Sequence, residues 1–178
     1  MKNLTIENMN EVSINKSINL SEHFTLGELC KTSAKTPDGN IPSHVHIENL
    51  KRLCGWLEKL RERYNQRYVL RSVSPPKLGG EEDTEEPIVI NSGYRSEAVN
   101  KSVGGVKGSN HLTGCAVDIR VAGIEQAMRY AVILMDYADE TKQDYDEILI
   151  EKNRYGAIWL HFAVRPTDNR RKTMFLQK

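Results

Sequence analysis

The sequence predicts an α+β domain, with a small, mostly antiparallel sheet and helices packed on one side of it. Two long segments repeat apolar residues every three or four positions, which is the spacing of one face of a helix. Short β-branched or alternating runs are typical of strands, and two of them lie close enough in sequence to form a hairpin. With 178 residues, the chain is long enough for one domain with its own core, whereas two full domains would be cramped.

The first half of the chain is expected to begin with a polar arm, residues 1–20, before a single domain over 21–178. A short helix is predicted around 25–31, and a loop follows over 32–42. The first long amphipathic helix comes next, and we expect its apolar face in the core. That face consists of Ile47, Leu50, Leu53, Cys54, Leu57 and Leu60.

An insertion loop is expected at about residues 72–87, and residues 81–86 are mostly acidic. Proline and glycine pairs precede the acidic run, a composition that is typical of a solvated loop. We expect mobility there, and a substrate-specific role is the less favoured alternative.

The second half alternates strands and helices. Residues 88–90 are predicted to form a strand, Ser96 can cap the short helix that follows, and 115–121 form the next strand. Residues 146–151 and 157–164 are predicted to pair as a hairpin. Between these strands, the second long helix is expected to pack on the sheet through Ile124, Met128, Ala131, Val132 and Met135.

The strongest functional signal is a set of two imidazoles and one carboxylate. His111 and Asp118 lie in the run Ser-Asn-His-Leu-Thr-Gly-Cys-Ala-Val-Asp, residues 109–118, and His161 lies in a later Trp-Leu-His. Such a set can hold Zn²⁺ on three sides and leave the fourth coordination position for water. The residues therefore indicate metal-assisted hydrolysis.

Strand alternation predicts how these side chains could meet. Asp118 should point to the face opposite its apolar neighbours, and Trp159 and His161 should share a face of their own strand. Gly114 can supply the sharp turn that leads into the Asp118 strand. The imidazole of His161 could then reach Asp118 across neighbouring strands.

On these residues, the sequence resembles the M15 peptidase group, which comprises zinc D-Ala-D-Ala carboxypeptidases and related peptidoglycan endopeptidases. The resemblance is to the branch with a compact, C-terminal-type domain. Residues 109–118 meet every defined position of the pattern Ser-x-His-x-x-Gly-x-Ala-x-Asp, and Trp-x-His follows. The similarity covers roughly residues 20–165. Other segments that resemble this branch are 24–29, 47–50, 92–96, Asn100 and 103–105.

The resemblance implies a role for each matching residue. His111, Asp118 and His161 would be the zinc ligands. Arg95 would lie near the substrate, where it could stabilise an oxyanion or hold a substrate carboxylate, although a surface ion pair is the alternative. Ser109 would be a supporting or loop-shaping hydroxyl at the substrate site rather than a nucleophile.

The general base is the one role for which this chain has no suitable residue at the position that the group uses. Many members of the group place Glu or Asp three residues before the last His, where this chain has Ile158, which cannot accept a proton. The nearest acid upstream is Glu151, which would lie near the mouth of the sheet if the hairpin forms. Glu151 is therefore the candidate base, with a solvated strand end as the alternative.

The resemblance implies a zinc metallopeptidase domain over residues 21–178 that cuts an amide bond in a peptidoglycan stem peptide or cross-link. The activity would be that of a carboxypeptidase or endopeptidase in cell-wall lysis or remodelling, as in an endolysin. The alternative is a catalytically impaired module that keeps the fold and binds peptidoglycan or serves as structure. Ile158 is the feature that favours this alternative.

Composition and charge limit the classes of partner that we expect for this protein. The 25 basic and 24 acidic residues leave a formal net charge of +1, so nucleic acid is not an expected partner. No apolar stretch reaches the length of a membrane span, and residues 1–8 lack the apolar core of a signal peptide. We expect a protein that is cytoplasmic as synthesised and acts at the cell wall after release or export.

Overall fold

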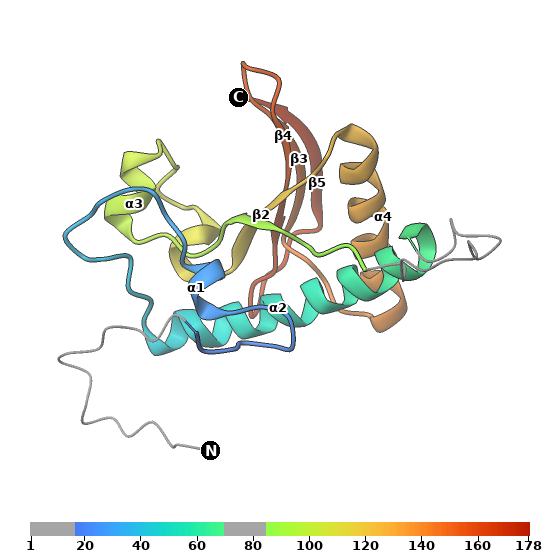
Figure 1. Ribbon diagram of the computed structural model, residues 1–178, viewed down its shortest axis with the longest axis horizontal. Coiled ribbons are helices and arrows are strands. Elements are labelled where there is room, and N and C mark those ends of the chain that lie inside the picture. The colour runs from blue at the N-terminus through green and yellow to red at the C-terminus, as the bar shows by residue number, and fades with distance from the viewer. Residues whose placement is uncertain (1–16, 70–84) are drawn as a thin grey trace, which may run out of the picture.

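A five-stranded sheet forms the centre of the computed structural model, which describes residues 17–69 and 85–178 (Figure 1). Its strands are β1 (Ile90–Ser92), β2 (Ala116–Arg120), β3 (Glu147–Lys152), β4 (Ile158–Ala163) and β5 (Lys172–Gln177). The α-helices are α1 (Leu26–Leu29), α2 (His44–Tyr64), α3 (Glu97–Ser102) and α4 (Ile124–Thr141). A π-helical turn, η2 (Asn65–Val69), extends α2, and a 3₁₀ turn, η3 (Asn110–Thr113), precedes β2.

The strand order is β1-β2-β4-β3-β5, and every neighbouring pair is antiparallel except β3 and β5. The predicted hairpin is present as β3 and β4, and the α+β class with a mostly antiparallel sheet is confirmed. Strand β5 was not expected from the sequence. Its residues Thr173, Met174 and Phe175 are all exposed, so the segment lacks the apolar alternation that marks a half-buried strand.

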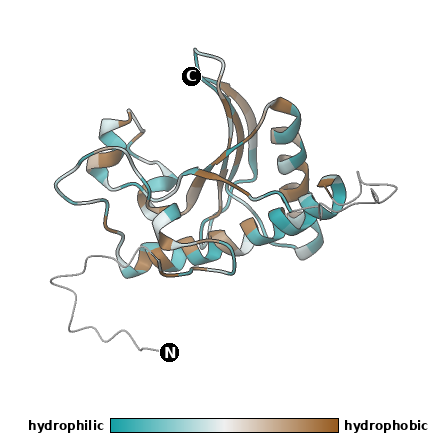
Figure 2. Ribbon diagram, viewed as in Figure 1, coloured by the Kyte–Doolittle hydropathy of each residue, from teal (hydrophilic) through white to brown (hydrophobic). Residues whose placement is uncertain are grey.

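The core lies between one face of the sheet and the helices α2 and α4. On the sheet, it contains Val117, Ile119, Ile148, Ile150, Leu160 and Phe162. Trp56 of α2 joins the layers, because its ring packs on Phe162 of β4 and edge-on against Tyr137 of α4. Figure 1 shows α4 on one side of the sheet and α3 on the other, and Figure 2 shows hydrophobic segments concentrated in the strands. One face of the sheet therefore builds the core and leaves the other face for polar side chains.

Helix α2 matches the expected pattern. Its predicted apolar residues from Leu50 to Leu60 are fully buried, and Ile47 packs partly against the core. The helix begins after Ser43, whose hydroxyl accepts a hydrogen bond from the His46 backbone N–H, while the His46 ring accepts one from the Ser43 N–H. This reciprocal cap satisfies backbone donors that a helix start leaves open.

Helix α4 forms where expected, but the predicted core face was wrong for three of its residues. Ile124, Met128 and Val132 are exposed, whereas Ala131 is buried and Met135 is partly buried. The side chains that α4 buries are Ala127, Tyr130, Ala131, Ile133, Leu134 and Ala138. Ala127, Tyr130, Ala131, Leu134 and Ala138 follow one another at the spacing of one helix face, whereas Met128 and Val132 lie one position further round the helix.

The polar arm and the insertion loop are described only in part. Residues 1–16 of the arm and 70–84 of the insertion lie outside the described residues. At the end of the insertion, Glu85 pairs with Arg61 of α2 at 2.8 Å, and the Glu86 N–H donates to Asn65 at 2.7 Å. Within the described ranges, the helices are too short or too polar to cross a membrane. The domain boundaries stay a prediction.

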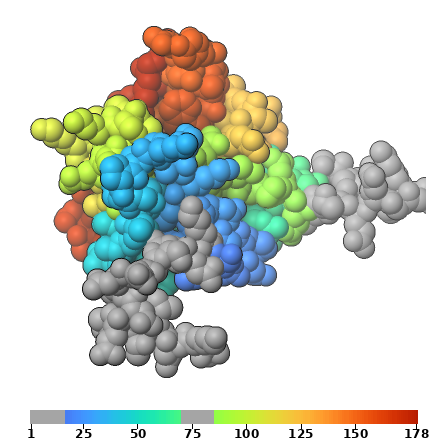
Figure 3. Space-filling view, turned by 60° about the vertical axis from the view of Figure 1, so that its left-hand side comes forward, coloured from blue at the N-terminus to red at the C-terminus, as the bar shows by residue number. Residues whose placement is uncertain are grey.

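Beside the sheet, the segment that contains α3 projects from the molecule, as the yellow-green atoms in Figure 3 show. Gly114 connects η3 to β2 and has φ +71°, a left-handed conformation that glycine adopts without strain. A Cβ atom at this position would lie 2.7 Å from the carbonyl oxygen of His46. The turn that carries His111 into the site therefore depends on glycine.

We expect Gly114→Ala to lower the free energy of unfolding by about 1–3 kcal/mol, because the new methyl group is overpacked against backbone. Gly55→Ala is the matched control: a Cβ atom on Gly55, inside α2, would have no neighbouring atom within 4 Å, so alanine should be neutral or stabilise by up to about 1 kcal/mol. Chemical denaturation of both variants measures the difference. Equal stabilities would contradict this account of the turn.

Candidate functional site

Strand pairing places Asp118 and His161 directly opposite each other, on the face of the sheet that points away from the core. Asp118 of β2 is the register partner of His161 of β4, while their neighbours Val117 and Phe162 pair on the core face. His111 comes from η3, next to the start of β2. The expected meeting of a strand carboxylate and a strand imidazole is therefore present in the fold.

The three side chains converge on one oxygen atom. Asp118 Oδ1 lies 2.9 Å from His161 Nδ1 and 3.3 Å from His111 Nε2. One donor atom from each residue lies within 4.8 Å of the others, and all three residues are buried. Two imidazole nitrogens and a carboxylate oxygen at this spacing form a donor set that suits zinc.

The outer contacts orient these donors. The second nitrogen of His111, Nδ1, lies 2.6 Å from the carbonyl oxygen of Gly93, and His161 Nε2 lies 3.4 Å from Glu147 Oε2. Metal-binding histidines usually have their other ring nitrogen held in this way, which fixes the tautomer and the ring orientation. The residues present therefore fit a metal ion.

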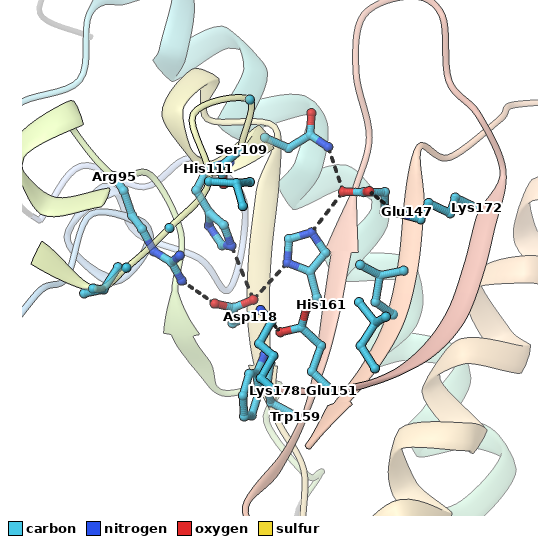
Figure 4. Close-up of a pocket in the computed structure, with 18 of the residues that line it drawn as sticks. Arg95, Ser109, His111, Asp118, Glu147, Glu151, Trp159, His161, Lys172 and Lys178 are labelled. Atoms are coloured by element: carbon cyan, nitrogen blue, oxygen red, sulfur yellow. Dashed lines mark hydrogen bonds and ion pairs between the residues drawn. The ribbon is translucent and has the colours of Figure 1, made fainter. Parts of the chain in front are cut away.

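Arg95 lies against the same cluster. Its guanidinium pairs through Nη2 with Asp118 Oδ2 (Figure 4), and its Nε donates to Ser92 Oγ at 2.8 Å. Asn40 holds the backbone on both sides, because its amide donates to the Tyr94 carbonyl at 3.1 Å and accepts from the Ser96 N–H at 2.7 Å. Arg95 is thus part of the pocket, and its ion partner is the central carboxylate.

Ser109 and Glu151 also lie at the site. Ser109 Oγ accepts a hydrogen bond from the His111 N–H at 3.3 Å and begins η3, which is a loop-shaping contact. Glu151 lies on β3, is buried, and accepts a hydrogen bond from Lys178 Nζ at 2.7 Å. Ile158 packs partly against the core instead, since strand alternation turns it away from His161.

These residues line a pocket of about 690 Å³. Strands β3, β4 and β5 contribute to its lining, and so do residues 103–106 and 108–111, Arg95 and Asp118. Figure 4 shows Glu147 and Glu151 on different sides of the His161 ring, with Lys178 and Trp159 near Glu151. The pocket places a candidate metal cluster, two further acids and several cations around one space.

The charged groups of the cluster shift one another's pKa values strongly. Burial alone would raise the pKa of Asp118, but the charges and hydrogen bonds of the two histidines hold it well below its usual value. Burial alone would lower the pKa of His161, whereas hydrogen bonds to Asp118 and Glu147 raise it to about 9. The hydrogen bond to His161 lowers the pKa of Glu147 to about 2 despite its burial. For His111, burial prevails and lowers the pKa. Both carboxylates are therefore ionised at neutral pH.

Sequence reasoning missed one carboxylate and several cations of this pocket. Glu147 is two positions before Leu149 and four before Glu151, so strand alternation places all three on the face of His161. That spacing was the available signal for Glu147. The basic residues of the pocket could not be placed without β5: Arg170 and Lys172 lie beside Glu147, and Lys178 lies beside Glu151.

Comparison with known proteins finds a family whose model matches part of the chain. A family model described as Peptidase M15 matches residues 80–143, a range that contains Arg95, His111 and Asp118 and ends before β3. No curated protein matches the chain. The family match and the converging His111, Asp118 and His161 together support an M15 peptidase group domain in this chain.

Proposed function

We propose that the protein is a zinc metallopeptidase that hydrolyses an amide bond in a peptidoglycan peptide, as a carboxypeptidase or an endopeptidase. The observation that carries the proposal is the convergence of His111 Nε2, Asp118 Oδ1 and His161 Nδ1 in the pocket of an M15 domain. M15 membership supports a peptidase in general. The substrate class rests on the sequence resemblance.

In this proposal, His111, Asp118 and His161 hold the zinc ion. The bound ion would lower the pKa of a water molecule and polarise the scissile carbonyl. Three protein ligands are typical of a catalytic zinc site, because structural sites are normally closed by four. The outer contacts of the two rings, to Gly93 and Glu147, would keep the donor atoms aimed at the ion.

Glu151 is the proposed general base. It would accept a proton from the attacking water and pass it to the leaving amine. Its position supports this role, since it is buried on β3, lines the pocket and lies close enough for its charge to act on His161. Lys178 Nζ contacts one carboxylate oxygen, Oε2, at 2.7 Å and so helps to hold the side chain in the pocket.

Arg95 is proposed to meet negative charge that develops on the substrate carbonyl oxygen. Its guanidinium lines the pocket, and its contacts with Ser92 and Asp118 hold it without a change of conformation during the reaction. Ser109 would shape the substrate-binding loop through its contact with His111. Cations on the β5 side of the pocket, Lys172 and Lys178 among them, suit a substrate that carries carboxylates, as peptidoglycan peptides do. The protein would act at the cell wall after release or export.

The first test joins zinc content with digestion of purified peptidoglycan. The wild type should bind about one zinc per chain and release muropeptides that mass spectrometry identifies, which would also assign the bond. Glu151→Gln should retain zinc but lower turnover at least about 100-fold, because the amide cannot take the proton. Glu125→Gln, at an exposed position on α4, is the control and should keep full activity. Bound zinc without products from any muropeptide would favour a binding module.

His161→Ala should remove zinc binding and activity together, because it deletes one of three proposed ligands. The exposed His44 offers a matched control, so His44→Ala should bind zinc as the wild type does. Metal analysis after dialysis and a muropeptide assay give the two readouts. A His161→Ala protein that holds one zinc and digests substrate normally would disprove the ligand assignment.

A further inference from the structure

Two acids lie on either side of the His161 ring, and their surroundings differ. Strand β3 places Leu149 opposite His161, so Glu147 and Glu151 occupy the flanking positions on the same face. Of the two, Glu147 contacts the outer nitrogen of the ring, with Oε2 3.4 Å from Nε2. Glu147 and Glu151 therefore have different surroundings, which suit different roles.

Both oxygens of Glu147 are held. Oε2 accepts a hydrogen bond from Asn110 Nδ2 at 3.0 Å in addition to its contact with His161. Oε1 lies 3.0 Å from Arg170 Nη2 and 3.4 Å from Lys172 Nζ. With 13% of its side chain exposed, the carboxylate has little freedom to turn. It is fixed as an acceptor for the ring.

The fully buried Asp146 binds Arg170 and Asn110, two side chains that also contact Glu147. Asp146 accepts hydrogen bonds from Arg170 Nε at 2.8 Å and Nη2 at 2.6 Å, and from Asn110 Nδ2 at 2.7 Å. Asn110 also directly precedes His111 in η3. One hydrogen-bonded network around buried Asp146 thus contacts the segments that carry both imidazoles.

We propose that Glu147 is a positioning residue that holds the His161 ring with Nδ1 toward Asp118, and thereby strengthens zinc binding without taking part in proton transfer. When Nδ1 faces a metal ion, Nε2 carries the ring hydrogen, and Glu147 Oε2 is its acceptor. The inference rests on the proposed zinc site. It assigns ring orientation to Glu147 and leaves the base role to Glu151.

The test measures zinc affinity, by competition with a chromophoric chelator, and requires no substrate. Glu147→Ala should weaken zinc binding about 10–100-fold, the usual effect of losing such an outer contact. Glu147→Gln should give a smaller loss, since its amide oxygen can still accept from Nε2. Glu125→Ala on α4 is the control and should stay within about twofold of the wild type, the ordinary spread for a surface change far from the site. Thermal unfolding of the metal-free proteins checks that each variant folds.

A second readout separates orientation from general stability. Two-bond ¹H–¹⁵N spectra of the zinc-loaded wild type should show His161 with its hydrogen on Nε2 and slow exchange of that hydrogen with water. In Glu147→Gln, the exchange should be faster, which a purely structural role would not cause. If Glu147→Ala does not fold, Glu147→Gln decides.

The possible failures are distinguishable. Wild-type zinc affinity in a folded Glu147→Ala, or wild-type affinity and exchange in Glu147→Gln, would overturn the role of Glu147 alone. A wild-type protein that binds no zinc would overturn the proposed metal site, and this inference with it.

Discussion

The pairing of β2 with β4 is the constraint on which the candidate site depends. Five register pairs, from Ala116 with Ala163 to Arg120 with Trp159, place Asp118 opposite His161. A slip of one residue would turn one of these side chains into the core, because successive residues point to opposite faces. Val117 and Phe162 oppose such a slip, since it would expose them to water. Hydrophobic packing on one face therefore fixes polar geometry on the other.

The central carboxylate explains why so many groups meet at this point. A buried charge is costly unless partners compensate for its lost hydration. Asp118 divides its oxygens between partners: Oδ1 faces the two imidazoles, and Oδ2 faces Arg95. Each partner is held in turn by a contact outside the cluster. The site is consequently preorganised by the protein alone, which limits the rearrangement that binding a cation would require.

The sequence pattern predicted those features that depend on the geometry of a single strand or helix. Alternation in β2 and β4 predicted the face of Asp118 and His161, and the spacing in α2 predicted its buried face. Helix α4 was harder, because two of its faces carry apolar residues: the face with Ala127 is buried and the one with Met128 is exposed. Strand β5 depends on parallel pairing with β3, a long-range contact that its own residues do not indicate. Without β5, the cations around Glu147 could not be located.

The acids of β3 show how one strand can supply two functions from one residue type. Glu147 and Glu151 share a face by alternation, yet their environments come from different ends of β5: Lys172 beside Glu147 and Lys178 beside Glu151. The first acid also contacts the ring of His161 and a network anchored by buried Asp146, so its proton affinity is low and its position is fixed. An acid held in this way is suited to orient a neighbour and poorly suited to accept a proton. The Ile158 substitution therefore does not by itself remove the proposed chemistry, because β3 offers a second carboxylate in the same pocket.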